Sequence, residues 1–173
     1  DLNSHFEEEA SQVPEEHLSI HKAFVQKELH PLIMSAPYPH RTFSKPLGYA
    51  GDYEMMNMIH REHPEGQNLY AQLVNAAYTN LPIAQSVKNR AFLLEEYLKA
   101  GTRHAIAKGR DFRALSIGCG PAIEVQRFIS GDNSSVRAHI DLVDFNTETL
   151  DFARKKVSEA IEQSGNHSEV CFI

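Results

Sequence analysis

Apolar side chains in the first part of the chain recur at three- and four-residue steps, which is the spacing of an amphipathic helix. This pattern predicts helices over residues 14–30, 53–63 and 68–79, and a longer helix from Pro82 to about Gly109. Asp52 and Pro82 support two of these starts, because aspartate caps a helix well and proline suits the first turn. Residues 31–53 hold four prolines and two glycines and therefore predict an ordered loop or a string of turns.

After Gly109 the pattern changes to short apolar runs. Residues 113–117, 136–144 and 169–173 predict strands, and residues 121–129 and 147–163 predict the helices that separate them. Strand–helix–strand units of this kind form parallel sheets through right-handed crossovers. The sequence therefore predicts an α/β protein: a helical cap (residues 1–109), then the first strands of a Rossmann-like parallel sheet (residues 110–173).

This predicted sheet is incomplete. Three parallel strands are too few for a nucleotide-binding sheet with both faces covered. The last strand would also leave an apolar edge without a partner, which proteins normally avoid. We therefore expect a missing C-terminal half, or another chain such as a second copy in a homo-oligomer, to cover this edge.

Composition excludes several classes of protein. The 173 residues are 42% apolar and 23% charged, a balance typical of globular proteins. A net charge of −6 without a basic stripe argues against nucleic-acid binding, and no apolar run approaches the roughly 18 residues that cross a bilayer. Two cysteines make no disulfide framework and no signal-peptide pattern is present, so we expect a cytoplasmic protein without stable membrane insertion.

Candidate chemistry gathers where the first two predicted strands end. Gly118 and Gly120 follow the first strand at once, and glycine permits a sharp turn and a close approach of the backbone to a ligand. The next helix would offer free N–H groups at its start. Asp144 ends the second strand, where an acid can accept both hydroxyls of an adenosine ribose. Phe145 could pack on the purine, and Asn146 could cap the following helix.

The segments ALSIGCGPAIEV and DFNTETLDFAR together resemble two consecutive motifs of the class I S-adenosylmethionine-dependent methyltransferases, over about residues 113–157. The resemblance implies S-adenosylmethionine as cofactor. It implies a cofactor site formed by Ser116, Gly118, Cys119, Gly120, Pro121, Asp144 and Phe145. An NAD(P)-dependent oxidoreductase is disfavoured, because Ile123 stands where the dinucleotide fingerprint needs a small residue. The methyltransferase motif often has an acid two residues before its first glycine, and this chain has Ser116 there.

Residues 29–61 and 82–98 also resemble the cap of a bacterial methyltransferase group that includes enzymes proposed to form methyl esters of 3-hydroxy fatty acids. This resemblance implies a small or fatty-acyl carboxylate as methyl acceptor. We expect Tyr49, Asp52, Tyr53 and Arg90 on the substrate side. Turn chemistry and helix capping at residues 49–53 are the alternative, and Arg90 could face the cofactor carboxylate or solvent.

A carboxylate acceptor is already ionised at neutral pH, so no catalytic base is assigned. No metal site is expected, since H-E-x-x-H is absent and the ten histidines include no convincing set of three ligands. The alternative to an enzyme is a non-catalytic adenosine-nucleotide-binding module or partner subunit, which would keep the same glycines and acid.

Overall fold

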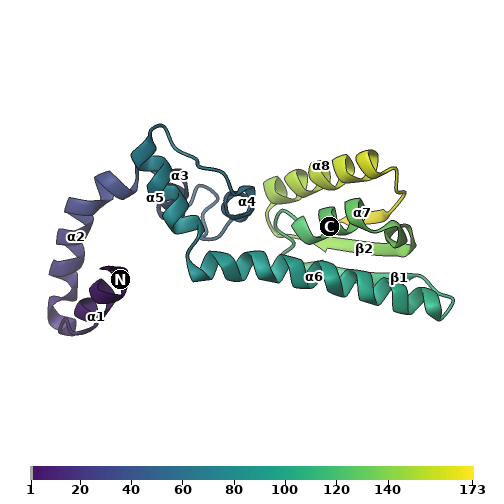
Figure 1. Cartoon of the computed structure of the whole chain (residues 1–173), viewed down its shortest axis with the longest axis horizontal. Coiled ribbons are helices and arrows are strands. Elements are labelled where there is room, and N and C mark those ends of the chain that lie inside the picture. Colours follow the sequence, from purple (N-terminus) through teal and green to yellow (C-terminus); the bar gives the residue numbers. More distant parts are fainter. Residues whose placement is uncertain (1) are drawn as a thin grey trace.

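The computed structural model describes residues 2–173 as an elongated chain in which one long helix joins two groups of elements (Figure 1). The long helix is α6 (Pro82–Ala107). The first group is helical: α1 (Leu2–Ser11), α2 (Leu18–Ile33), α3 (Pro37–Ser44), α4 (Tyr53–Arg61) and α5 (Leu69–Thr79), with a short 3-10 helix (Glu15–His17) before α2.

The prolines of the predicted loop do not prevent helix formation. Pro37 lies in the first turn of α3, where the missing N–H of proline has no intrahelical partner to lose. Pro31 lies near the end of α2, and that helix continues for two more residues. The prediction of a loop over residues 31–53 is therefore wrong for α3. The predicted cap Asp52 accepts hydrogen bonds from the first turn of α4, and Asn68 caps α5 in the same way.

α6 runs without interruption through Gly101. An added Cβ at Gly101 would lie 2.5 Å from the ring of Phe112, so the absence of a side chain allows the first strand to pack closely on α6. The helix ends before Gly109, whose φ of +72° suits glycine. The predicted boundary near residue 110 marks the change of element type, but the second half of α6 packs on the α/β layer.

The second group alternates strands and helices, as predicted. Its elements are β1 (Phe112–Ile117), α7 (Ile123–Gly131), a 3-10 helix η2 (Asn133–Arg137), β2 (Ala138–Val143), α8 (Thr147–Ser164) and β3 (Glu169–Phe172). All pairing is parallel in the order β1-β2-β3, with Ile117 opposite Val143 and Leu142 opposite Phe172. The predicted α/β class and parallel sheet are confirmed.

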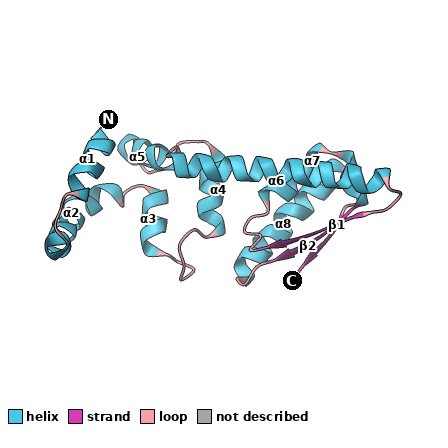
Figure 2. Ribbon diagram, turned by 90° about the horizontal axis from the view of Figure 1, so that it is seen from below, coloured by secondary structure: helices cyan, strands magenta, loops and turns pink. Residues whose placement is uncertain are grey.

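Helices cover one face of this sheet. α6, α7 and α8 lie on the same side of the strands (Figure 2), and Ile140 and Leu142 of β2 are fully buried among Val125, Phe128 and Val157. On the opposite face, side chains remain open among residues 2–173: Leu115 is 59%, Ile117 79% and Ile173 65% exposed. The structure thus has the partial Rossmann-like arrangement that the sequence predicts.

Candidate functional site

The turn between β1 and α7 takes a conformation that the sequence pattern requires. Gly118 and Gly120 have φ values of +70° and +55°, in the left-handed region that favours glycine. Ala122 also has a positive φ of +52°, so the chain reverses tightly before α7 begins. An added Cβ at Gly118 or Gly120 would meet no atom within 4 Å. Both glycines therefore border open space into which a ligand can approach.

The amide groups of this turn are already paired within the protein. Gly118 and Cys119 donate to the carbonyl oxygen of Val143, and Gly120 donates to Oδ2 of Asp144 at 3.1 Å. The amides of Gly118, Cys119 and Gly120 are therefore not free to bind a ligand. In the part of the chain that the structure describes, the unpaired backbone N–H nearest this turn is that of Ile123, at the start of α7.

Asp144 links the turn to the tip of the neighbouring strand. Its second oxygen, Oδ1, accepts a hydrogen bond from the amide of Asn146 at 3.0 Å. Each carboxylate oxygen can accept more than one hydrogen bond, so both retain acceptor capacity towards a ligand. Asn146 itself caps α8 through the amide of Thr149, as predicted. The carboxylate is thus held beside the glycine turn by two backbone amides.

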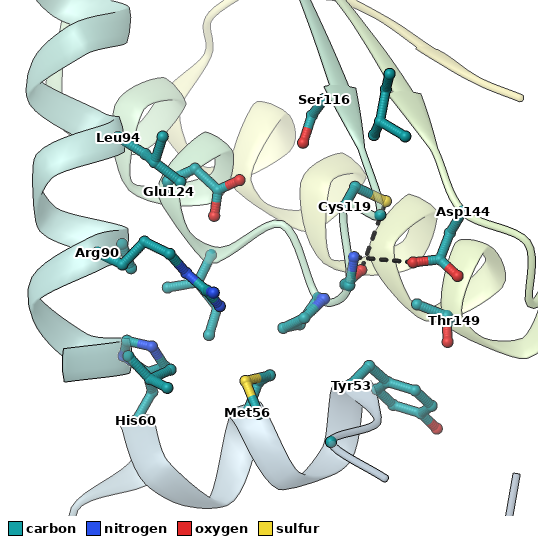
Figure 3. Close-up of a pocket in the computed structure, with 18 of the residues that line it drawn as sticks. Tyr53, Met56, His60, Arg90, Leu94, Ser116, Cys119, Glu124, Asp144 and Thr149 are labelled. Carbon is teal, nitrogen blue, oxygen red and sulfur yellow. Dashed lines mark hydrogen bonds between the residues drawn. The ribbon is translucent and has the colours of Figure 1, made fainter. Parts of the chain in front are cut away.

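A cavity of about 400 Å³ lies in front of this turn, between the α/β layer and the helical cap. Its volume falls within the range of small-molecule sites, roughly 300–1,000 Å³. Figure 3 shows side chains reaching it from α4, α6, β1, α7, β2 and α8. The cavity is lined by Tyr49, Gly51, Tyr53, Met56, His60, Val87, Arg90, Ala91, Leu94, Ser116, Ile117, Gly118, Cys119, Gly120, Pro121, Ile123, Glu124, Asp144, Phe145 and Thr149.

The cavity brings together most of the residues selected from the sequence. All seven predicted cofactor-side residues line it: Ser116, Gly118, Cys119, Gly120, Pro121, Asp144 and Phe145. Tyr49, Tyr53 and Arg90 also line it, although they come from the cap and from α6. Residues far apart in the sequence therefore meet around one space.

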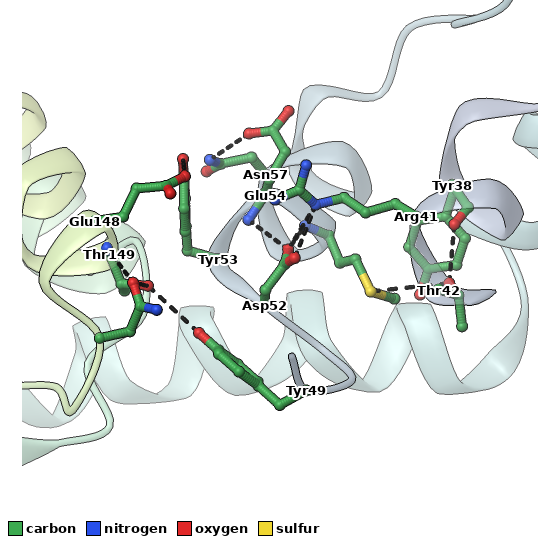
Figure 4. A network of polar contacts seen from close by, with 12 residues as sticks. Tyr38, Arg41, Thr42, Tyr49, Asp52, Tyr53, Glu54, Asn57, Glu148 and Thr149 are labelled. Carbon is green, nitrogen blue, oxygen red and sulfur yellow. Dashed lines mark hydrogen bonds and ion pairs between the residues drawn. The ribbon is translucent and has the colours of Figure 1, made fainter. Parts of the chain in front are cut away.

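Asp52 is the exception, because it does not line the cavity. It is 1% exposed, accepts hydrogen bonds from the amides of Glu54 and Met55, and binds Nε of Arg41 through both oxygens at 2.9 Å (Figure 4). A buried carboxylate is stable when it is paired in this way. Asp52 thus has the helix-capping role that the sequence allowed as the alternative: it caps α4 and links α4 to α3 through Arg41.

Tyr49 and Tyr53 attach the cap to α8. The hydroxyl of Tyr49 lies 3.4 Å from that of Thr149, and the Tyr53 hydroxyl donates to Glu148 at 2.9 Å (Figure 4). The Tyr49 ring lies 4.9 Å from that of Phe145, which is 79% exposed at the rim of the cavity. These contacts hold one wall of the cavity against the other.

Half of the lining residues were not selected from the sequence, and Met56, His60 and Glu124 are three of them. Met56 and His60 face the cavity from α4, and Glu124 faces it from the first turn of α7 (Figure 3). Burial and the charges of Arg127 and Lys88 lower the pKa of His60 to about 4, so its imidazole is neutral near pH 7. An acid in the first turn of the helix after a glycine turn was the only sequence signal for Glu124.

Cys119 has no features of a nucleophile. Burial and the nearby Asp144 carboxylate raise the pKa of its thiol to about 11. The thiol points towards the carbonyl oxygen of Gly120 at 3.7 Å. Cys119 therefore contributes packing and backbone to the turn.

One group of potential metal ligands lies away from the cavity. Ligand atoms of His139, Asp141 and Cys171 lie within 4.8 Å of one another, on neighbouring positions of β2 and β3. Nδ1 of His139 is already paired with Glu169 at 2.9 Å. No sequence motif marks these residues.

Comparisons of the chain with protein-family models, with curated proteins and with solved structures gave no match. Among residues 2–173, no helix is both long enough and apolar enough to cross a membrane. The function of the site is therefore argued from its own geometry and chemistry.

Proposed function

We propose that the cavity binds S-adenosylmethionine and that the protein transfers its methyl group to an oxygen, with a small or fatty-acyl carboxylate as the favoured acceptor. One observation carries the proposal: the Asp144 carboxylate touches the amide of Gly120, so acid and glycine turn border the same cavity. Had the carboxylate pointed away from the turn, the two sequence motifs would not form one site.

The lining residues fit an adenosine-containing cofactor. The space in front of Gly118 and Gly120 is free of protein atoms, so a ligand can pass close to the backbone there. Asp144 offers carboxylate oxygens to the ribose hydroxyls. Phe145 and Tyr49 present aromatic rings at the same end of the cavity, where an adenine could pack.

Bound in this way, S-adenosylmethionine would supply a sulfonium methyl group: an acceptor carboxylate oxygen would form the new O–CH3 bond as the S–CH3 bond broke, and the electron pair of that bond would stay on sulfur. The protein's part is to hold the acceptor in line and to exclude water. Met56, Tyr53 and Val87 give the cap side of the cavity an apolar wall suited to an acyl chain. No residue has to remove a proton from a carboxylate.

Charge near α4 also favours an anionic acceptor. Arg127, Lys88 and Arg90 lower the pKa of His60 and Glu62 raises it, so more cations than anions act on this imidazole. Lys88 is paired with Glu62 at 2.9 Å, whereas Arg90 lines the cavity. A ligand carboxylate beside His60, whether of the cofactor or of the acceptor, would therefore meet a favourable field.

A nicotinamide dinucleotide fits the site less well. Its pyrophosphate would lie at the start of α7, where the dinucleotide fingerprint places a small residue. Here Ile123 stands at that start and its side chain lines the cavity. A non-catalytic binding module fits the same nucleoside contacts and is separated from an enzyme by the experiment below.

The test is calorimetric titration of the purified chain with S-adenosylmethionine and with NAD, followed by an assay for transfer of a radioactive methyl group to 3-hydroxydecanoate. We expect binding of S-adenosylmethionine, no binding of NAD, and methyl transfer to the carboxylate. Binding without transfer to any carboxylic acid would support the non-catalytic module instead. Binding of NAD in preference to S-adenosylmethionine would overturn the proposal.

A matched pair of glycine variants assigns the binding to this turn. Gly120 and Gly165 both have positive φ, and an added Cβ at either meets no protein atom within 4 Å. Gly120 lines the cavity, whereas Gly165 ends α8 and does not. We expect Gly120→Ala to weaken binding and Gly165→Ala to leave it unchanged, although both alanines are strained by a similar amount, about 1–2 kcal/mol.

A further inference from the structure

Two opposite charges face the cavity at the end remote from Asp144. Arg90 extends from α6 and Glu124 from the first turn of α7, and both line the cavity on the α6 side (Figure 3). Asp144 lies on the other side of the glycine turn in the same view. The cavity therefore has an acidic end at β2 and an end with one cation and one anion near α6.

Within residues 2–173, neither charge is satisfied by another side chain. Arg90 and Glu124 form no ion pair and no side-chain–side-chain hydrogen bond, although each acts electrostatically on the other. Burial raises the pKa of the Glu124 carboxyl, because desolvation penalises its charged form. Arg127 also acts on Glu124, but it does not line the cavity.

Two opposite charges that face one cavity without a side-chain partner are complementary to a zwitterion. An α-amino acid group carries an ammonium and a carboxylate a few ångströms apart, and each would form a charge-assisted hydrogen bond with the opposite partner. S-adenosylmethionine ends in such a group, separated from its ribose by the sulfonium centre. With the ribose at Asp144, that group would extend past the glycine turn towards α6.

We propose, on the basis of the function proposed above, that Arg90 binds the carboxylate and Glu124 the ammonium of the cofactor's amino acid end. The methyltransferase motif often has an acid at the position of Ser116 in β1. In this chain, Glu124 of α7 would provide that acidic group instead. Ser116 also lines the cavity and offers a neutral hydroxyl there. Arg90 is thereby a cofactor-binding residue rather than a substrate-binding one.

The test uses calorimetry with three nucleosides: S-adenosylmethionine, decarboxylated S-adenosylmethionine, and 5′-methylthioadenosine, which lacks the whole amino acid end. We expect Arg90→Gln to weaken binding of S-adenosylmethionine alone, by roughly 10- to 100-fold. Glu124→Gln should weaken both ligands that keep the amine and leave 5′-methylthioadenosine unaffected. Arg110→Gln and Glu162→Gln are the controls, since these exposed residues lie outside the cavity.

The outcomes separate this proposal from the function on which it rests. The wild-type protein should bind S-adenosylmethionine at least about 10-fold more tightly than 5′-methylthioadenosine, a ratio that needs no variant. Equal affinity for the two, or variants that weaken all three ligands alike, would overturn the amino acid site and leave the nucleoside site intact. If the wild-type protein binds none of the three, the proposed function itself fails.

Discussion

Asp144→Asn is the substitution that most directly tests the nucleoside site. The carboxylate accepts one backbone amide on each oxygen, from Gly120 at 3.1 Å and from Asn146 at 3.0 Å. Asparagine keeps the shape but has one acceptor oxygen, so one of the two amides loses its partner. A hydrogen bond to a charged group contributes about 1.5–3 kcal/mol, and water at this half-buried site would recover part of it. We expect the free energy of unfolding to fall by about 1–2 kcal/mol.

The effect on ligand binding should be larger. Each of two ribose hydroxyls can donate a hydrogen bond to the carboxylate. Asparagine, with its single acceptor oxygen, can accept only one of these two hydrogen bonds. Losing one charge-assisted hydrogen bond, about 1.5–3 kcal/mol, raises Kd for S-adenosylhomocysteine by roughly 10- to 150-fold. Calorimetry measures the affinity, and urea denaturation without ligand measures the stability separately.

Asp141→Asn is the matched control. Asp141 lies on the same strand and undergoes the same change of charge, but it faces away from the cavity beside Cys171. We expect this variant to bind S-adenosylhomocysteine as the wild-type protein does. If Asp144→Asn lowers stability but leaves Kd unchanged, the carboxylate only tethers the glycine turn, and the reasoning that makes it a ribose ligand is refuted.

The remaining predictions concern packing, thiol reactivity and pH. Leu142→Ala, at a fully buried site, should lower the free energy of unfolding by about 2–5 kcal/mol, whereas Leu115→Ala, 59% exposed on the open face, should lower it by less than about 1 kcal/mol; urea denaturation compares them. At pH 8, iodoacetamide should modify exposed Cys171 and not Cys119, whose thiol pKa is about 11, and peptide mass spectrometry locates the label. The pKa of His60 is lower in the folded protein, about 4, than its ordinary 6.5, so the unfolded chain binds more protons between these values. Stability should therefore fall as pH drops from about 6.5 to 4, and His60→Gln should reduce that dependence in thermal melts at several pH values.

Local signals in the sequence were sufficient for most of the fold. A strand followed at once by glycines, and caps such as Asp52 and Asn146, act over a few residues and can be recognised without tertiary information. The missed helix α3 shows where this approach fails. A high proline content favours a loop on average, but Pro37 suits the first turn of a helix, and packing against α5 decides the outcome.

The candidate site was predictable only in its cofactor half. The carboxyl ends of neighbouring parallel strands lie side by side at one edge of a sheet. The sequence is therefore sufficient to bring together the residues that follow β1 and β2: Gly118, Gly120 and Asp144. His60 and Met56 reach the cavity because α4 packs against α6, and no local pattern in residues 53–63 specifies that contact. Residues that belong to the site only through packing between the cap and the α/β layer therefore require the structure.

Asp52 and Glu124 both lie near glycines in the sequence, but only the packing of neighbouring elements shows which of the two acids can bind a ligand. Asp52 stands in a turn bounded by glycine and was selected as a site residue, yet its oxygens are occupied by two amides and by Arg41. Glu124 looks like an ordinary acid in the first turn of a helix, yet its carboxylate faces a cavity without a side-chain partner in the described chain. Residue type and spacing in the sequence do not distinguish these two acids, because each lies near glycines at the start of a helix. Asp52 is buried, fully paired and outside the cavity, whereas Glu124 faces the cavity without a side-chain partner among the described residues, and that difference is visible only once neighbouring elements are placed in space.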